Sequence, residues 1–218
     1  MILTDIDIRD RVFNSIKYTK VYEMNKFNVE SVPLIEPFNE KQLEGCAYDV
    51  KITNKITRFK NEFKKISLES KSEISACYEE IDITMGYDLR PGEYILVKLQ
   101  EVINMPNDLA AHIRPRTSLN KIGIILSSQN INPSYCGALS LGVYNASPYV
   151  VEIKPNLPIG QVVFETLTNI PTKEKLYINK DTAKYQNEIG FVGSKIYDDL
   201  QEKVKEEYNK ILNNIRGL

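Results

Sequence analysis

The feature that most constrains the fold is a series of short β-type runs between residues about 48 and 170, separated by Gly, Pro and Asn. The runs read YDVKITNKITRF, YILVKLQEVI, AAHIRP, GIILSS, ALSLGVYNAS, YVVEIKP and IGQVVFETL. Runs of this length between turn-forming residues indicate strands. Many in succession predict a mainly β fold, a sandwich or a jelly roll. The polar segment KNEFKKISLESKSEISACYEEIDITMGYD predicts an insertion with weak strands.

Helical patterns are expected at both ends of the chain. Residues 4–20 predict a short N-terminal helix with Thr4 as its cap. Its expected apolar face consists of Ile6, Ile8, Val12, Phe13 and Ile16. A second amphipathic helix is predicted beyond Lys195, with an apolar stripe at helical spacing. That stripe consists of Leu200, Val204, Tyr208, Ile211, Leu212 and Ile215. We therefore expect a β domain over 1–195 and a helical extension over 196–218, which packs on its own assembly or binds a protein partner.

Composition narrows the classes of function. The chain has 218 residues, 42% of them hydrophobic, and a net charge of −1. A net charge this close to zero gives no overall electrostatic attraction to DNA, RNA or a membrane surface. The sequence lacks an apolar run of about 20 residues and a signal-peptide core, so we expect a cytoplasmic protein. Three widely spaced cysteines predict reduced thiols. With one histidine, His112, and no C-x-x-C pair, we expect no zinc site.

A basic turn before an apolar strand is the main candidate for chemistry. It carries Arg114, Arg116, Thr117, Ser118 and Lys121 within RPRTSLNKIGI. Arginine forks, short hydroxyls and a lysine charge held at one turn suit a phosphate chain. A solvated turn with scattered charge is the alternative interpretation, and the residues alone do not separate the two.

Several segments in collinear order resemble the dCTP deaminase and trimeric dUTPase superfamily, in its deaminase branch. RPRTSLNKIGI is similar to the motif R-S-S-L-x-x-x-G-L. The other segments are MILTDIDI, LIEPFNEKQLEGCAYDVKITNKITRF, LRPGEYILVKLQEVINMPNDLAAHIRPR, VYNASPYVVEIKPNLPIGQVVFETL and YINKDTAKYQNEIG. The resemblance covers residues 1–194. It implies a distorted jelly roll of the dUTPase-like type, a homotrimer with sites between subunits, and Mg²⁺ held mainly through nucleotide phosphates.

The resemblance also assigns residues to a nucleotide site. Arg116, Thr117 and Ser118 match Arg-Ser-Ser, and Lys121 takes the place of a second arginine. Tyr177 and Lys184 match a phosphate-contacting tyrosine and lysine. The full set is Arg116, Thr117, Ser118, Lys121, Asn132, Tyr135, Gln161, Tyr177, Lys184 and Glu188. Glu188 replaces a glutamine, and an acid there would repel phosphate unless it were protonated or turned away.

Two departures from the family pattern fall on the proton-transfer positions. Gly142, in LGVYN, stands where the deaminases carry the glutamate of L-E-F-Y-N. Asn132, in INPSYCG, stands where the dUTPases carry the aspartate of I-D-x-x-Y-x-G. Neither replacement is a usable base near neutral pH. The hairpin expected between Gly123 and Gly137 is also shorter than the family pattern, which predicts a reshaped pyrimidine pocket.

These residues favour a binding protein that sequesters or senses a phosphorylated nucleotide. We assign no catalytic residue to it. Losing one general base commonly removes a factor of about 10²–10⁴ in rate. The alternative is a metal-independent dCTP deaminase or dUTP diphosphatase with a relocated base. Candidates for that base are Glu44, Asp49, Glu152 and Glu188. A third hypothesis is a structural scaffold whose function lies in the C-terminal helix.

Overall fold

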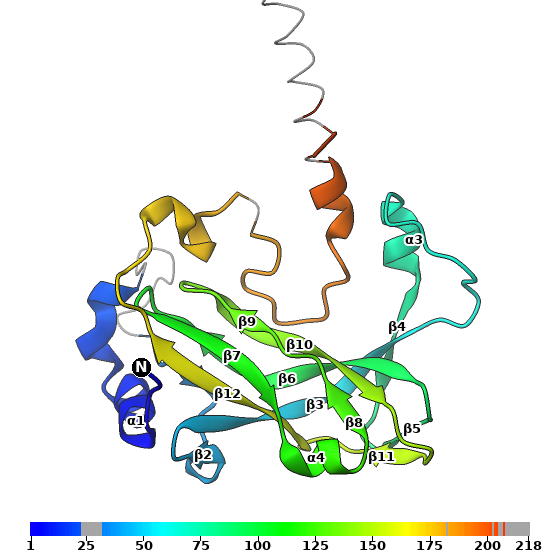
Figure 1. Cartoon of the computed structure of the whole chain (residues 1–218), viewed down its shortest axis with the longest axis horizontal. Helices are drawn as coiled ribbons and strands as arrows, with labels where there is room; N and C mark the ends of the chain where they lie inside the picture. The colour runs from blue at the N-terminus through cyan, green and yellow to red at the C-terminus, as the bar shows by residue number, and fades with distance from the viewer. Residues whose placement is uncertain (23–31, 182, 202, 205–206, 208–218) are drawn as a thin grey trace, which may run out of the picture. The chain divides into compact units, whose positions relative to one another are not determined.

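The computed structural model describes residues 1–22, 32–181, 183–201, 203, 204 and 207 (Figure 1). Two compact units are distinguished within this part of the chain. The first comprises Met1–Arg58 and Glu80–Phe191, and the second comprises Phe59–Glu79 and the described residues from Val192 onward. The expected division into 1–195 and 196–218 stays a prediction, because most of the second segment lies outside the described residues.

A ten-stranded sheet forms the main element of the structure. The order of its principal strands is β8-β10-β6-β3-β12-β7-β9, while β1 pairs with β6 and both β2 and β4 pair with β3. Their bounds are β1 Ile35–Glu36, β2 Leu43–Glu44, β3 Ala47–Phe59, β4 Tyr78–Asp82, β6 Tyr94–Asn104, β7 Leu109–Pro115, β8 Ile124–Leu126, β9 Asn130–Ile131, β10 Cys136–Asn145 and β12 Pro158–Thr166. A smaller antiparallel sheet pairs β5 Tyr87–Leu89 with β11 Val151–Ile153. The mainly β prediction is confirmed, and each of the seven expected runs contains a strand.

The core forms where alternate side chains of these strands turn inward. On β6, Ile95, Val97 and Leu99 are buried, as the period of two along a strand predicts. Tyr48 on β3 and Phe164 on β12 are the largest fully buried side chains. This inward face is continuous with residues from β7, β8 and β10 in one hydrophobic cluster. The other face of β6 and β10 is therefore available for polar groups.

The N-terminal helix is shorter than expected. Helix α1 spans Asp5–Phe13, and Thr4 caps it in a reciprocal capping box with Asp7. The chain then continues as the 3-10 helix η1, Ser15–Val21. Ile8 and Val12, four residues apart on one face, are buried. The rest of the predicted apolar face was wrong, because Ile6, Phe13 and Ile16 are exposed. Ile6 is two residues from Ile8 and so lies on another side of α1, Phe13 is the last residue of α1, and Ile16 lies in η1.

Two expected features of the central segment were wrong. The basic turn is a short helix, α4, Thr117–Lys121. The segment between Gly123 and Gly137 is not a hairpin, because β8 pairs with β10 while β9 pairs with β7. Hydrogen bonds of the connecting loop to both sheet ends explain this arrangement: Ser127 N donates to Gly142 O at 2.8 Å, and Ser128 Oγ donates to Ile113 O at 2.9 Å. The loop thus joins the two ends of the strand order.

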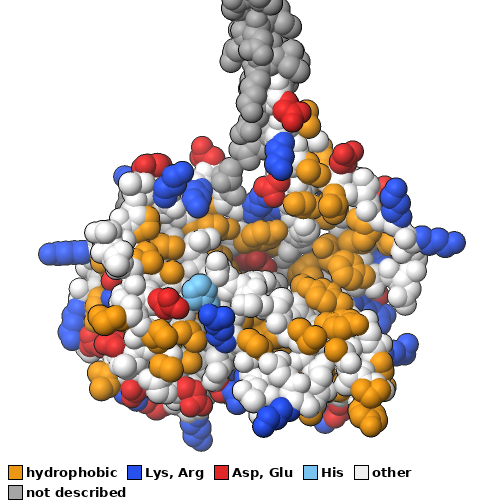
Figure 2. Space-filling model, in the orientation of Figure 1, with side chains coloured by type: hydrophobic (Ala, Val, Ile, Leu, Met, Phe, Trp, Pro, Cys, Tyr) orange, Lys and Arg blue, Asp and Glu red, His pale blue; other side chains and the backbone are white. Residues whose placement is uncertain are grey.

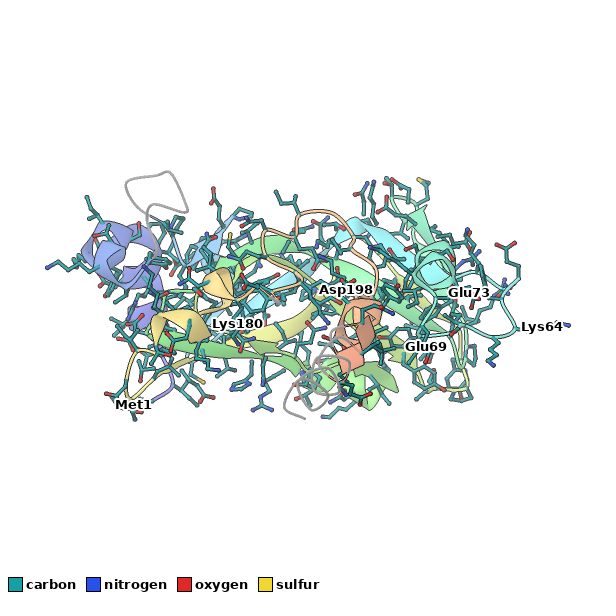
Figure 3. The ribbon with its side chains drawn as sticks, turned by 90° about the horizontal axis from the view of Figure 1, so that it is seen from above. Met1, Lys64, Glu69, Glu73, Lys180 and Asp198 are labelled. Atoms are coloured by element: carbon teal, nitrogen blue, oxygen red, sulfur yellow. The ribbon has the colours of Figure 1, made fainter. Side chains whose placement is uncertain are left out.

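The second unit contains helix α3, Lys71–Ala76, which the expected insertion did not include. Ser70 caps α3, Ile74 is buried, and the Glu73 carboxylate accepts a hydrogen bond from Ser67 N at 2.8 Å. Figure 3 shows Glu73 on α3, Glu69 just before it, and Lys64 pointing outward from the preceding loop.

The C-terminal extension is helical at residues 196–201, 203, 204 and 207, as predicted. Tyr208, Ile211, Leu212 and Ile215 of the apolar stripe lie outside the described residues. Within the described chain, the structure contains no helix of the length and apolarity that a membrane span requires.

Candidate functional site

Arg116 lies at the centre of the first candidate cluster, which we call the Arg116 cluster: Arg116, Asp49 and Gln161. Arg116 is the N-cap residue of α4, and its Nη1 donates to Asp49 Oδ2 on β3. Gln161 on β12 donates through Nε2 to Asp49 Oδ1 at 2.9 Å. Residues 49 and 161 are directly paired across the two strands, so the sheet register brings them together. Both carboxylate oxygens of Asp49 are thus engaged within the chain.

A buried polar network supports the strand that carries Asp49. Gln42 Nε2 donates to Asp49 O at 2.8 Å and to Glu101 Oε1 at 2.6 Å. Glu101, which is 2% exposed, also accepts from Lys51 N at 3.0 Å through Oε2. Burial raises the pKa of Glu101, while these hydrogen bonds favour its charged form and oppose that effect. The network fixes Asp49 in position beneath Arg116.

The remaining groups of α4 are open to solvent. Thr117 and Ser118 in its first turn and Lys121 in its last are all exposed. Arg114 on β7, paired with Gln161, is exposed as well. The guanidinium of Arg116 is held by the Asp49 carboxylate and is surrounded by hydroxyls and a second cation. Arg116 can therefore exchange Asp49 for an anionic oxygen of a ligand.

A second group of predicted residues lies around Tyr135 and the segment after β12. Tyr135 is 5% exposed, and its hydroxyl has no hydrogen-bond partner within the described chain. The Tyr177 ring packs edge-on against it, with centroids 5.7 Å apart. Tyr177 begins the 3-10 helix η4, Tyr177–Asn179, which follows η3, Lys173–Lys175. Its hydroxyl accepts from Tyr185 N at 3.0 Å, so this ring is fixed by packing and by the backbone.

Asn132 and Lys184 lie at the borders of this group. Asn132 is exposed, and its backbone oxygen accepts from Tyr135 N at 3.1 Å. Lys184 is partly exposed on the segment that leads to Glu188. Both side chains are accessible to a ligand that approaches from solvent or from another subunit.

Glu188 is turned inward and anchors the tail segment, which we define as residues 183–191. Its carboxylate oxygen Oε1 accepts from Lys98 Nζ at 2.9 Å and from Ser140 Oγ at 2.8 Å. The side chains of Lys98 and Glu188 are 10% and 6% exposed. Burial lowers the pKa of Lys98, and the ion pair with Glu188 opposes that effect. The acid at position 188 therefore balances a lysine of its own chain.

Gly142 lies under the ring of Tyr94. A Cβ placed on Gly142 would lie 2.0 Å from Tyr94 Oη and 2.6 Å from Cζ. Tyr144 lies two residues after Gly142 on β10, and its cross-strand partner on β6 is Tyr94. Both tyrosines are 38% exposed. Figure 2 shows hydrophobic side chains gathered at the centre of the face turned to the viewer. The tyrosine ring thus occupies the space that a side chain at position 142 would need.

The donor groups of the chain fit Mg²⁺ only as an ion carried by phosphates. Within the described residues, His, Cys, Asp and Glu side chains do not form a group of three or more that could hold a metal ion. The nearest carboxylate to the predicted phosphate site, Asp49, uses its two oxygens for Arg116 and Gln161. A magnesium ion would therefore need ligand oxygens to complete its coordination.

The predicted site residues fall into two groups rather than one. Figure 1 shows α4 and the segment that contains η3 and η4 at opposite ends of the first unit. Lys180, labelled in Figure 3, marks the end that carries η4. Sequence reasoning missed Lys98, Ser140 and Tyr94, which contact predicted positions from neighbouring strands. The alternation on β6 and β10 places them on the outer face, but it does not identify their partners.

Comparisons with known proteins agree on one family. A family model described as dCTP deaminase-like matches residues 25–167. A protein named "dCTP deaminase, dUMP-forming" from Dictyoglomus turgidum is 30% identical over 203 residues, covering 91% of this chain and 96% of that protein. Its namesake from Dictyoglomus thermophilum is 29% identical over 207 residues, with 93% and 98% covered.

One solved structure supports the fold. The crystal structure of 2'-deoxycytidine 5'-triphosphate deaminase from Agrobacterium tumefaciens superposes with a TM-score of 0.55 at 17% identity. The match covers 76% of this chain and 48% of that one, so the chain spans about half the length of that protein. At this identity the similarity concerns the fold.

Proposed function

Because the chain belongs to the dCTP deaminase-like family, we propose that it binds a phosphorylated nucleotide at the interfaces of a homotrimer and does not turn it over. Its role would be to sequester or to sense that nucleotide. The Arg116 cluster and the exposed hydroxyls of α4 supply the phosphate side. Mg²⁺ would accompany the phosphates and neutralise part of their charge.

The homotrimer is supported by the separation of the two groups of site residues. Helix α4, whose N-cap is Arg116, lies at one end of the first unit, and the segment that contains η3 and η4, with Tyr177, lies at the other (Figure 1). A nucleotide that contacts both groups would have to lie between two copies of the chain. A closed ring of identical contacts produces three equivalent sites of that kind.

The observation that carries the absence of turnover is the contact between Gly142 and Tyr94. A glycine supplies no proton-transferring group, and the Tyr94 hydroxyl, 2.0 Å from the Cβ position of Gly142, occupies the space where a longer side chain would begin. Asn132 is likewise no base at neutral pH. General acid–base catalysis requires a titrating group within hydrogen-bond reach of the reacting atoms. Neither proton-transfer position expected from the family provides one.

The second candidate function is an active dCTP deaminase, and the names of the curated relatives favour it. Asp49 is the best-placed relocated base, because it lies directly beside Arg116. Glu188 is committed to Lys98 and Ser140. Glu44 is exposed, and Glu152 is exposed and paired with Lys154 at 2.9 Å. The alternative therefore depends mainly on Asp49.

Calorimetry with dCTP, dUTP and their monophosphates, in Mg²⁺, tests the binding. Arg116→Ala removes a charge-assisted fork and should weaken triphosphate binding by about 1.5–3 kcal/mol, or roughly 10- to 100-fold. Arg90→Ala, at an exposed arginine on another loop, is the matched control and should leave affinity unchanged. Equal affinities for the Arg116→Ala and wild-type proteins would exclude α4 as the phosphate site.

Asp49→Asn separates the two functions. The amide keeps the acceptor for Gln161 but loses the charge that holds Arg116. In a binding protein, this change frees Arg116 and should tighten triphosphate binding by about 10-fold. In an enzyme that uses Asp49 as its base, it should abolish release of ammonia or pyrophosphate. Light scattering at the same concentrations measures the oligomer, and a stable monomer would remove the interfacial site.

A further inference from the structure

A cavity of about 260 Å³ lies on the outer face of the sheet, beneath the end of the tail segment. It belongs entirely to the first unit and does not include α4. Its lining residues come from β3, β4, β6, β10 and the tail. The residues that determine its chemistry are Thr57, Leu96, Lys98, Ser140, Ile189 and Phe191.

The floor of the cavity follows from strand register. Thr57 on β3 is paired with Leu96 on β6, and Lys98 on β6 is paired with Ser140 on β10. Leu96 and Lys98 are two residues apart, so their side chains leave the sheet on the same face. Ile95 and Val97 alternate with them and point into the core. The floor thus combines one apolar side chain with two hydroxyls and an ammonium group.

The tail segment closes the cavity from above and is held firmly. Lys98 Nζ donates to Gly190 O at 3.0 Å as well as to Glu188 Oε1. Ala138 N on β10 donates to Glu188 O at 2.8 Å. These bonds hold Phe191 against the cavity and Ile189, which is 78% exposed, at its rim. The space is therefore built by two ordered elements rather than by an open surface.

The charges around the cavity cancel in pairs. Lys98 is matched by Glu188, and Lys55 at the cavity edge is matched by Glu80 at 2.7 Å. A phosphate in this space would need a cation without a partner, and burying an uncompensated charge costs several kcal/mol. An uncharged ligand meets no such penalty. Apolar walls with hydroxyl groups between them suit a flat ring that has a polar edge.

We propose that this cavity is a second ligand site, which takes a neutral heterocycle of nucleobase size, either as the free base or as the nucleoside. Leu96 and Phe191 form its apolar walls, and Thr57 and Ser140 supply hydrogen-bonding groups to the polar edge of the ring. Its volume lies just below the usual range of about 300–1,000 Å³ for ligand pockets, so a larger molecule would not enter. The site is separate from the phosphate site at Arg116 and extends the proposed function.

Saturation-transfer NMR and calorimetry with deoxycytidine, deoxyuridine, thymidine, deoxyadenosine and deoxyguanosine test the proposal. Leu96→Phe fills the cavity and should weaken binding of the preferred nucleoside by at least ~10-fold. Leu68→Phe, at a side chain that is 56% exposed, is the matched control and should keep wild-type affinity. Thermal unfolding of both variants verifies that the fold is intact.

A second pair of variants tests the polar edge without changing volume. Thr57 is 3% exposed, and Thr57→Val removes its hydroxyl while keeping its shape. This variant should weaken nucleoside binding measurably, whereas Thr168→Val at an exposed threonine should not. The Arg116→Ala variant should bind nucleosides as the wild type does, even if it binds triphosphates more weakly.

Three results would overturn the proposal. One is that none of the five nucleosides and their free bases binds at millimolar concentration. Another is that binding survives Leu96→Phe unchanged. The third is that Arg116→Ala removes nucleoside binding, which would assign it to the phosphate site. Failure of triphosphate binding alone would contradict the proposed function and leave this site standing.

Discussion

Adding a single methyl group at Gly142 tests the contact that carries the proposed loss of turnover. In Gly142→Ala, the new Cβ would lie 2.0, 2.6 and 2.9 Å from Oη, Cζ and Cε2 of Tyr94, so the ring has to move. Overpacking of this kind costs about 1–3 kcal/mol. Replacing a strand glycine by alanine otherwise gains roughly 0.5–1 kcal/mol. Because Tyr94 is 38% exposed and can rotate outward, we expect a net loss of about 1 kcal/mol.

The Tyr94→Ala background reverses the sign of that effect. Without the ring, Gly142→Ala should stabilise the protein by roughly 0.5 kcal/mol. The coupling between the two positions is then about 1.5 kcal/mol, measurable by a double-mutant cycle in urea denaturation at fixed protein concentration. Equal effects of Gly142→Ala in both backgrounds would refute the reasoning. Gly142→Glu alone should yield no deamination, because its side chain first has to displace the Tyr94 ring, and a base acts only within hydrogen-bond reach of the reacting atoms.

Three further predictions concern buried groups. Lys98→Met leaves the Glu188 carboxylate without its cation and should cost about 3–5 kcal/mol in denaturant unfolding; the double variant with Glu188→Met should recover most of this, and equal losses in both would contradict a paired charge. Burial raises the pKa of Tyr48 to about 12 from an ordinary value of about 10. The stability that its neutral form contributes is therefore present below pH 10 and is lost as the pH rises toward 12. Tyr48→Phe should flatten that loss, and an unchanged dependence of the unfolding free energy on pH would be evidence against it. Cys46 is exposed, while burial raises the pKa of the Cys77 thiol; native thiol labelling should modify Cys46 first, and faster modification of Cys77 would contradict the packing.

The strands were predictable because their evidence is local. Alternation, β-branched residues and turn-forming residues lie within a few positions of one another, so each run indicates its own strand. Thr4 and Asp7 show the same for the cap of α1, where a reciprocal capping box forms over three residues. The end of α1 was not predictable in this way, because the apolar pattern continues through Ile16 while the chain changes to 3-10 geometry.

The contacts of the candidate site depend on residues that are far apart in the sequence. Arg116 and Asp49 are 67 positions apart, and Lys98 and Glu188 are 90 positions apart. Periodicity places each residue on a face of its strand, but it does not say which strand lies beside it. The pairing of β8 with β10 and of β9 with β7 illustrates the point, since two nearby runs joined by a short loop usually form a hairpin.

Arg116 and Lys98, the two cations paired with carboxylates, differ in how readily they can leave their partners. This difference suggests a class of ligand for each site. The Arg116 side chain is 29% exposed, so a phosphate can reach its guanidinium from solvent. The Asp49 carboxylate is only 9% exposed, but it would keep its hydrogen bond from Gln161 Nε2 at 2.9 Å. Lys98 is 10% exposed and also holds Gly190 O, so separating it from Glu188 would leave a charge in a covered space. An exchange of partners is therefore easier at α4, where the cation faces solvent, than beneath the tail segment, where both partners are covered. We therefore expect the anionic groups of a ligand at Arg116 and the neutral ring in the cavity beside Lys98.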